Sequence, residues 1–457
     1  MMIKQGMKAT ITIDSIAAGG DGVGRIDGMA VFVPNTCRGD EAEIVLNKVK
    51  SGCAYGTVTK ILQPSSCRRA DFCALSGACG GCDFAHMTYS EQLLVKHQIV
   101  QDALTRIGGF KDVSLSDTLP APRPERYRNK MVFPFGRDEA GYVRGGFFAQ
   151  NSHTLVPLDD CRQGDEAVSR YLFAVVEYLE ETRTTLYDEK TGRGAARRLF
   201  VRLAEGTKEA MVVLVANTKK LKEPQVLIDK LLAVESDYEI KSIMLNIHTK
   251  PNNLVLGEQN KVLYGKDTIS DVLCGLTFSI GAHSFYQINS PQTERLYNTA
   301  LDMAELCGNE TILDLYCGIG TISLFAAKRA KKVIGVEIVR QAIENAKENA
   351  AKNGIINTEF MLGSAESIAP KLAQTGLSPS VVVLDPPRKG AEASALDAII
   401  KMNPEKVVYV SCNPATLARD AKYLCAHGYH LKKATPVDMF PNTSHVECCV
   451  LLCRTQQ

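Results

Sequence analysis

The region from about residue 284 to the C-terminus alternates buried strands with helices, and this pattern constrains the fold more than any other sequence feature. Residues 311–316 form an apolar, strand-like run, and Gly318 and Gly320 follow directly and open a helix. Further strand-like runs lie between helical segments at residues 333–337, 358–362, 381–384 and 406–410. Strands that alternate with helices at this spacing predict βαβ units around a parallel sheet. We therefore expect a Rossmann-like α/β domain in this part of the chain.

The turn after the first of these strands predicts the ligand class. The glycines of Gly318-Ile-Gly320 let the backbone approach a ligand at a helix N-terminus. Such a turn fits nicotinamide and S-adenosylmethionine domains alike, but Ser323 stands where a dinucleotide fingerprint has its third glycine. Glu337 ends the next strand, where a carboxylate can bind two ribose hydroxyls. Without a diphosphate to hold, the pattern favours S-adenosylmethionine.

Asp385-Pro-Pro-Arg388 and Cys412 bear on the acceptor. Amino-methylating enzymes commonly place an aromatic residue after an Asn/Asp-Pro-Pro turn, whereas this chain has Arg388 there. A carbon acceptor is then favoured, and a cysteine nucleophile can activate carbon. Cys412 follows the strand at 406–410, and Pro414 stops that strand, so the thiol lies at the carboxyl edge where ligands bind. Taken alone, Cys412 would also fit a small buried thiol.

The N-terminal residues 1–65 predict a small OB-like β-barrel. Ala9, Ile11 and Ile13 alternate with polar residues, and short strand-like runs follow at 29–34, 42–49 and 54–62. Several short strands at this spacing are typical of a barrel, although a generic β-domain fits as well. Barrels of this kind often bind oligonucleotides on one face, so the region is a candidate RNA-binding domain.

A cysteine-rich segment predicts a metal centre. Cys73, Cys79 and Cys82 are spaced by five residues and then two, and Gly80-Gly81 permits the tight turn that the second spacing needs. A fourth ligand could come from distant Cys161 or from nearer Cys67. Spacing alone does not distinguish zinc from an iron–sulfur cluster.

The sequence pattern of residues 66–265 predicts a central α+β region. A helix is expected over residues 90–110, capped by Ser90, and it could pack on the C-terminal domain. The residues that recur on one face at helical spacing are Leu93, Leu94, His97, Val100, Leu104 and Ile107. Residues 123–150 are rich in arginine and aromatic residues, which predicts RNA contact, with a strand pair and basic edge as the alternative. Hairpins are expected at 199–216 and 252–264.

Length and composition limit the classes of protein. The chain has 457 residues, so several domains are expected, and its net charge of +2 requires any RNA-binding surface to be local. No apolar run reaches the length of a membrane span, and the N-terminus lacks a signal peptide's apolar core. Fifteen cysteines form an odd count that does not suit a disulfide framework. We expect a cytoplasmic protein without membrane association, and a monomer.

The motifs together resemble the RNA uracil-C5 methyltransferase family that carries an N-terminal TRAM domain and a 4Fe–4S cluster. The resemblance covers essentially the whole chain. Its matching motifs are, in order, Phe285-Tyr-Gln287-Ile-Asn289, Asp314-Leu-Tyr-Cys-Gly-Ile-Gly320, Gly335-Val-Glu337, Asp385-Pro-Pro-Arg388, Ser411-Cys-Asn-Pro414 and His445-Val-Glu447. The resemblance implies the following roles: Cys412 as nucleophile, Glu447 as base, Gln287, Tyr316, Glu337 and Asp385 as S-adenosylmethionine contacts, and Cys73, Cys79, Cys82 and Cys161 as cluster ligands. Cys67 lies outside the matched ligand set.

The resemblance implies methylation of uracil C5 in RNA through a covalent adduct between Cys412 and uracil C6. It favours 23S rRNA as the substrate, because the barrel and the cluster typify the rRNA-directed members. Transfer RNA is the alternative substrate. A protein of another class, a non-catalytic RNA-binding protein with a redox-sensing cluster, would bind S-adenosylmethionine without turnover. The three domains expected are residues 1–65, 66–265 and 266–457.

Overall fold

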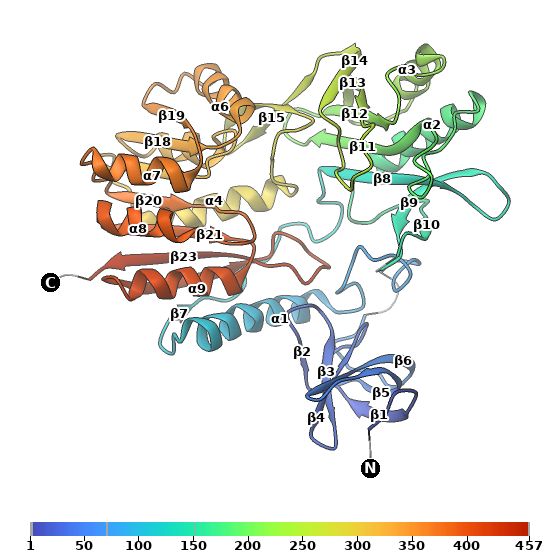
Figure 1. The fold of residues 1–457 in the computed structure, drawn as a ribbon, viewed down its shortest axis with the longest axis horizontal. Coiled ribbons are helices and arrows are strands. Elements are labelled where there is room, and N and C mark those ends of the chain that lie inside the picture. Colours follow the sequence, from blue (N-terminus) through green and yellow to red (C-terminus); the bar gives the residue numbers. More distant parts are fainter. Residues whose placement is uncertain (1–2, 70–71, 151, 456–457) are drawn as a thin grey trace.

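A computed structural model of the chain describes residues 3–69, 72–150 and 152–455. An N-terminal β-barrel lies at one end of the molecule, and a mixed sheet with its helices lies at the opposite end from it (Figure 1). The C-terminal α/β unit stands beside that mixed sheet, with helix α1 running along its lower edge in this view (Figure 1). The molecule therefore has three structural regions, and α1 lies with the C-terminal region although it precedes the central sheet in the chain.

The N-terminal barrel is built from alternating strands. Its strand order is β1-β5-β6-β4-β3-β2. The buried residues of β5 alternate with partly exposed ones and include Ile44 and Leu46, which pack against Ile11 and Val31. This is the alternation that a half-buried strand requires. The bounds are β1 Lys8–Thr12, β2 Ser15–Ile16, β3 Gly22–Ile26, β4 Met29–Val33, β5 Glu41–Val49 and β6 Cys53–Gln63.

Helix α1 (Tyr89–Asp102) continues as a π-helix, η1 (Ala103–Gly108), and ends at Gly109 with a φ of +79°. The expected cap at Ser90 is wrong, because the helix begins after Thr88. The expected apolar stripe is also wrong in part: Leu94 is 58% exposed, whereas Gln92 and Lys96 are fully buried. Val100 and Leu104 are buried in an apolar cluster as expected, whereas Gln92 and Lys96 are buried against polar groups of residues 438–442. Apolar packing and polar tertiary contacts together orient this helix.

The central sheet has the order β10-β9-β8-β11-β12-β13-β14. Its bounds are β8 Lys130–Arg137, β9 Val143–Phe148, β10 Leu155–Pro157, β11 Ala196–Ala204, β12 Glu209–Ala216, β13 Glu239–Ile247 and β14 Gln259–Gly265, with helices α2 Glu166–Glu181 and α3 Pro224–Leu232. The expected hairpin within 252–264 is wrong, since β14 pairs instead with β13. Tyr127, Phe133 and Phe135 are buried, so these aromatic residues serve the core and are not free to stack bases.

The C-terminal sheet has the order β19-β18-β17-β20-β21-β23-β22-β7. Its first five strands are parallel, and β23 joins antiparallel to β21. The chain reverses direction across the sheet beside β17, which is the switch point where ligands bind in such folds. The strands are β17 Thr311–Leu315, β18 Lys332–Glu337, β19 Thr358–Leu362, β20 Val381–Leu384, β21 Lys406–Ser411, β22 Tyr429–Val437 and β23 Glu447–Arg454.

Helices cover both faces of this sheet (Figure 1). They are α4 Ser290–Ala304, α5 Thr321–Ala327, α6 Arg340–Lys352, α7 Ala365–Gln374, α8 Ala393–Met402 and α9 Pro414–Cys425, and the hairpin β15 Thr268–Leu273 and β16 Leu276–Gly281 precedes them. The short strand β7 (Ser114–Leu115), which follows α1, pairs in parallel with β22. None of the helices in the described residues is long and apolar enough to span a membrane.

Candidate active site

Strand register brings three of the predicted cosubstrate residues to one edge of the sheet. Leu315, the last residue of β17, pairs with Val336 of β18 and with Leu384 of β20. The next residues along these strands are Tyr316, Glu337 and Asp385. Because the three strands are parallel, their carboxyl ends meet at the same edge. Tyr316, Glu337 and Asp385 therefore lie in a row there.

The glycine turn between β17 and α5 leaves room for a ligand. Gly318 has a φ of +56°, and no heavy atom lies within 4 Å of the position that a Cβ would take there. Its amide donates a hydrogen bond of 3.1 Å to Glu337 Oε2, while Glu337 Oε1 accepts one of 2.8 Å from the amide of Val339. Gly320 has a φ of +83°, and a Cβ there would stand 3.2 Å from that of Ala346. The turn is thus open at Gly318 and closely packed at Gly320.

Asp314 is a functional candidate that the sequence reasoning did not single out. It lies within β17, is 1% exposed, and accepts a hydrogen bond of 2.5 Å from Ser323 Oγ. Its Oδ1 is buried without a hydrogen-bond partner in the described part of the chain. Burial first, and then the nearby Asp385 and Glu337, raise the pKa of Asp314 to about 7 against the opposing effect of Ser323. A carboxyl group inside an apolar strand run was the signal that could have revealed it.

Cys412 and Glu447 come together through the antiparallel pairing of β21 with β23. Ser411 pairs with Cys448, so the next residue of β21 and the preceding residue of β23 stand opposite each other. Those residues are Cys412 and Glu447, which are 35 positions apart in the chain. Cys412 is partly exposed, whereas Glu447 is 3% exposed. The predicted nucleophile and base thus occupy one site.

Burial dominates the electrostatics of this pair. It raises the pKa of Glu447 to about 8, with a further rise from Asp385 and an opposing effect of Arg388. Burial also raises the pKa of the Cys412 thiol, as does Glu447, while charge attraction and a hydrogen bond from Arg388 lower it. The pKa of Asp385 is raised to about 7 by burial. Arg388 is therefore the group that favours the thiolate, a role that the sequence reasoning did not assign.

Gln287, the fourth predicted cosubstrate residue, lies just before α4. It is 8% exposed, and its carbonyl accepts a hydrogen bond of 2.8 Å from Asn129 Nδ2. Asn129 also donates to Ser290 Oγ at 3.1 Å. Residues of the central region thus fix the turn that carries Gln287. No hydrogen bond among the described residues joins Gln287 to Tyr316, Glu337 or Asp385.

The four predicted cluster ligands line one cavity of about 270 Å³. They are Cys73, Cys79, Cys82 and Cys161. Gln163 Nε2 donates a hydrogen bond of 3.1 Å to Cys82 Sγ, and Arg128 and Lys130 line the same cavity. Within residues 3–69, 72–150 and 152–455, no group of three or more Cys, His, Asp or Glu side chains is arranged to hold one metal ion.

Cys67 stands apart from this cavity. Its thiol donates to Glu91 Oε2 at 3.3 Å, and its carbonyl accepts from the amide of Thr88 at 2.8 Å. Cys67 therefore contacts the start of α1, and it is not among the residues that line the cavity. Of the alternatives for a fourth ligand, the structure brings Cys161 to the other three cysteines.

Comparison with known proteins finds two family models that match separate parts of the chain. A family model described as tRNA (uracil-5-)-methyltransferase matches residues 88–455, and a TRAM domain model matches residues 4–59. The chain belongs to this uracil-5-methyltransferase family. Its members are S-adenosylmethionine-dependent RNA methyltransferases. The predicted TRAM domain and methyltransferase fold are thereby confirmed.

Members of the family match over nearly the full length. A protein of Clostridium tetani named an uncharacterized RNA methyltransferase is 44% identical over 450 residues, which cover 98% of this chain and 97% of that protein. One of Bacillus cereus with the same name is 41% identical over 447 residues, covering 98% and 96% of the two chains. The crystal structure of the Pyrococcus abyssi tRNA (uracil-54, C5)-methyltransferase with S-adenosyl-L-homocysteine superposes with a TM-score of 0.76, at 28% identity, over 97% of this chain and 99% of that one.

Proposed function

We propose that this protein methylates uracil C5 in RNA through a transient bond between Cys412 and uracil C6. The observation that carries the proposal is the register of β21 and β23, which places a thiol opposite a buried carboxyl group. Membership of the uracil-5-methyltransferase family supports the reaction class. Cys412 as nucleophile and Glu447 as base are the roles that this geometry suits.

The carboxyl edge of the sheet suits S-adenosylmethionine. Gly318 leaves space at the turn, and Asp314 has a buried oxygen without a hydrogen-bond partner among the described residues. We propose that Tyr316, Glu337, Asp385 and Gln287 hold the molecule, with Glu337 on the ribose hydroxyls. When bound, S-adenosylmethionine supplies an electrophilic methyl group.

Cys412 begins the proposed reaction. Uracil C5 is a poor nucleophile, so the Cys412 thiolate first attacks C6, and the C5=C6 electron pair moves into an enolate. Formation of that S–C6 bond makes C5 nucleophilic. C5 then forms a bond to the methyl group, and the S–CH3 bond of S-adenosylmethionine breaks to leave S-adenosylhomocysteine. Arg388 lowers the pKa of the Cys412 thiol and so increases the thiolate fraction against the effect of burial.

Glu447 completes the reaction. Its carboxylate removes the proton from C5, the electron pair of the C5–H bond restores the C5=C6 double bond, and the S–C6 bond breaks to release Cys412. Because burial raises its pKa to about 8, Glu447 is poised near the operating pH of a general base.

We further propose that Cys73, Cys79, Cys82 and Cys161 bind a 4Fe–4S cluster. Four thiolates are the ligand set of such a cluster, and all four line one cavity. A single zinc ion needs its ligands gathered about one point, whereas a cluster binds each thiolate at a separate iron. The basic side chains of Arg128 and Lys130 in the lining suit the negative charge of a thiolate-bound cluster. When bound, the cluster would join segments about 80 residues apart.

For the substrate we propose 23S rRNA. The resemblance of the TRAM barrel and of the cysteine set to rRNA-directed enzymes supports this choice. Transfer RNA is the second candidate, and it is favoured by the similarity to the Pyrococcus abyssi enzyme, whose named substrate is tRNA uracil-54. Nucleoside mass spectrometry of 23S rRNA and of tRNA from a deletion strain would distinguish them. Loss of 5-methyluridine from tRNA alone would reject the rRNA proposal.

The reaction itself is tested with purified protein, S-adenosylmethionine and RNA from the deletion strain. We expect 5-methyluridine from the wild-type protein and none from Cys412→Ala. A product methylated at another atom, or full activity of Cys412→Ala, would reject the proposal. Binding of S-adenosylmethionine without methylation of any RNA would instead favour a non-catalytic RNA-binding protein.

A further inference from the structure

The loop of residues 438–446 delivers Glu447 to the active site. Val437, the last residue of β22, pairs with Glu447, the first residue of β23, so the loop begins and ends at the sheet. Glu447 Oε2 is buried and lacks a hydrogen-bond partner in the part of the chain that the structure describes. The direction of its carboxyl group therefore depends on the backbone path of this loop.

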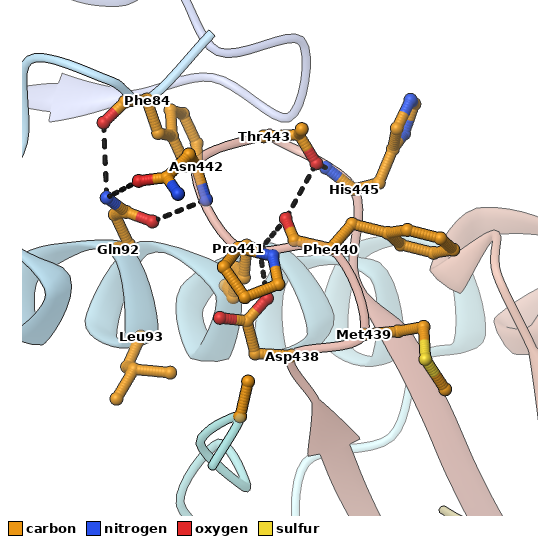
Figure 2. A network of polar contacts seen from close by, with 12 residues as sticks. Phe84, Gln92, Leu93, Asp438, Met439, Phe440, Pro441, Asn442, Thr443 and His445 are labelled. Atoms are coloured by element: carbon orange, nitrogen blue, oxygen red, sulfur yellow. Dashed lines mark hydrogen bonds and ion pairs between the residues drawn. The ribbon is translucent and has the colours of Figure 1, made fainter. Parts of the chain in front are cut away.

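Helix α1, far away in sequence, holds the loop from one side. Gln92 Oε1 accepts a hydrogen bond of 2.8 Å from the Asn442 amide, and Gln92 Nε2 donates one of 3.2 Å to Asn442 Oδ1 (Figure 2). Lys96 forms a fully buried ion pair with Asp438 and donates a bond of 2.9 Å to the carbonyl of Phe440. Helix α1 therefore binds the loop near its start, at Asp438 and Phe440, and near its middle, at Asn442.

The segment next to Cys82 holds the same loop from a second side. Asp83 Oδ2 accepts a hydrogen bond of 2.9 Å from Ser444 Oγ, and the amide of Phe84 donates one of 3.0 Å to the Asn442 carbonyl. Gln92 also donates to the Phe84 carbonyl at 3.2 Å, so it joins the two anchors (Figure 2). Asn442 has a φ of +66°, a left-handed conformation that persists only where surrounding contacts fix it.

The loop also reaches the nucleophile. His445 Nε2 lies 3.4 Å from an Arg388 guanidinium nitrogen, and Arg388 is the group that lowers the pKa of the Cys412 thiol. In Figure 2 His445 stands at the end of the loop opposite Asp438 and points away from α1. Displacement of the loop would therefore move the base Glu447 directly, and it would affect the Cys412 thiol through its charged neighbours Arg388 and Glu447.

We propose that Gln92 and Lys96 are positioning residues that hold the loop 438–446 so that Glu447 faces uracil C5. The inference rests on the proposed covalent mechanism. Stability alone does not account for these side chains, because a buried ion pair can often be replaced by apolar residues without loss of stability. A positioning role does account for Gln92 and Lys96, because their bonds to the backbone amide and side chain of Asn442 and to the side chain of Asp438 are directional. Such bonds hold the loop backbone in one path.

The test uses the order of the reaction steps. Attack by Cys412 and methyl transfer precede removal of the C5 proton, so a misplaced Glu447 leaves methylated RNA attached to the enzyme. With ordinary uridine RNA, we expect Gln92→Leu to accumulate a denaturation-resistant enzyme–RNA adduct and to release product about tenfold to a hundredfold more slowly. Adduct formation on 5-fluorouridine RNA, which needs Cys412 but not Glu447, should match the wild-type rate.

Gln98→Leu is the matched control. Gln98 is an exposed residue of α1, and among the described residues its side chain bonds only to Asp102 on the same helix, at 2.9 Å. It should release product like the wild type. Because Lys96→Met alone would leave Asp438 buried without its partner, the second variant is Lys96→Met combined with Asp438→Leu. It should accumulate the same adduct.

The inference is overturned if the two test variants release product at the wild-type rate. It is also overturned if they lose fluorouridine adduct formation in the same proportion as turnover, because the network would then be structural only. Failure of the wild-type protein to form any fluorouridine adduct is a different result. It would overturn the covalent mechanism and, with it, the assigned role of this loop.

Discussion

Replacing Glu447 by glutamine should change how the stability of the protein depends on pH. The Glu447 side chain is 3% exposed, and burial raises its pKa from 4.5 to about 8. In the unfolded chain this group ionises at its ordinary pKa, so between these two values the folded state binds the proton more tightly. Stability is therefore present below the unfolded pKa and is lost as pH rises towards 8.

The size of the effect follows from the pKa shift. One unit corresponds to about 1.4 kcal/mol, so the full shift to about 8 costs the wild-type protein about 5 kcal/mol at high pH. About 4 kcal/mol of this loss falls between pH 5 and pH 9. Glutamine does not titrate, so Glu447→Gln should become more stable relative to the wild type by that amount across this interval.

Thermal unfolding of the wild-type protein and Glu447→Gln at several pH values measures the difference. A change of about 4 kcal/mol corresponds to a shift in Tm on the order of 10 °C for a domain of this size. Glu405→Gln, at an exposed position just before β21, controls for the exchange itself. If the difference in Tm between Glu447→Gln and the wild type were the same at pH 5 and pH 9, the reasoning about the buried carboxyl group would be refuted.

Four further expectations follow from the site. The kcat/KM should increase with pH up to about 8, because a Glu447 with a pKa of about 8 is only about one-tenth ionised at pH 7. A kcat/KM that does not change with pH would contradict this. Arg388→Ala should slow alkylation of Cys412 by iodoacetamide at neutral pH, because Arg388 lowers the pKa of the thiol; Cys412→Ala gives the background, and unchanged alkylation would reject the role of Arg388. Gly320→Ala should lower the Tm by the equivalent of about 1–2 kcal/mol, because its φ of +83° strains any residue with a Cβ, and an unaltered Tm would show that the turn adapts. Cys82→Ser should reduce the iron and sulfide content of anaerobically purified protein, and wild-type content in this variant would remove Cys82 from the proposed ligand set.

Much of the C-terminal domain could be predicted from local sequence. Its strands are continuous apolar runs, as expected for a parallel sheet that is buried on both faces. Their positions therefore follow from the hydrophobic pattern alone. The edge at which Glu337, Asp385 and Cys412 lie follows as well, because parallel strands share one carboxyl end. That Glu447 stands opposite Cys412 does not follow from the pattern, since it depends on the pairing of β23 with β21.

Helix α1 shows where local sequence was insufficient. Its apolar residues predicted a buried stripe, yet Leu94 is exposed while Gln92 and Lys96 are buried against residues about 350 positions away. The decisive partners, Asp438 and Asn442, cannot be recognised by periodicity. Likewise, Tyr127, Phe133 and Phe135 were candidates for base stacking but pack in the core, whereas Tyr142 is 61% exposed. Periodicity does not distinguish aromatic residues that pack in the core from those that remain accessible.

The most direct test of the covalent mechanism uses RNA that contains 5-fluorouridine. Fluorine at C5 cannot leave as a cation, so after methyl transfer the reaction stops with Cys412 still bound to C6. Incubation with S-adenosylmethionine followed by peptide mass spectrometry should find the methylated fluorouridine on the peptide that contains Cys412, and Cys412→Ala should give no adduct. An adduct on another residue, or one that persists in Cys412→Ala, would contradict the mechanism.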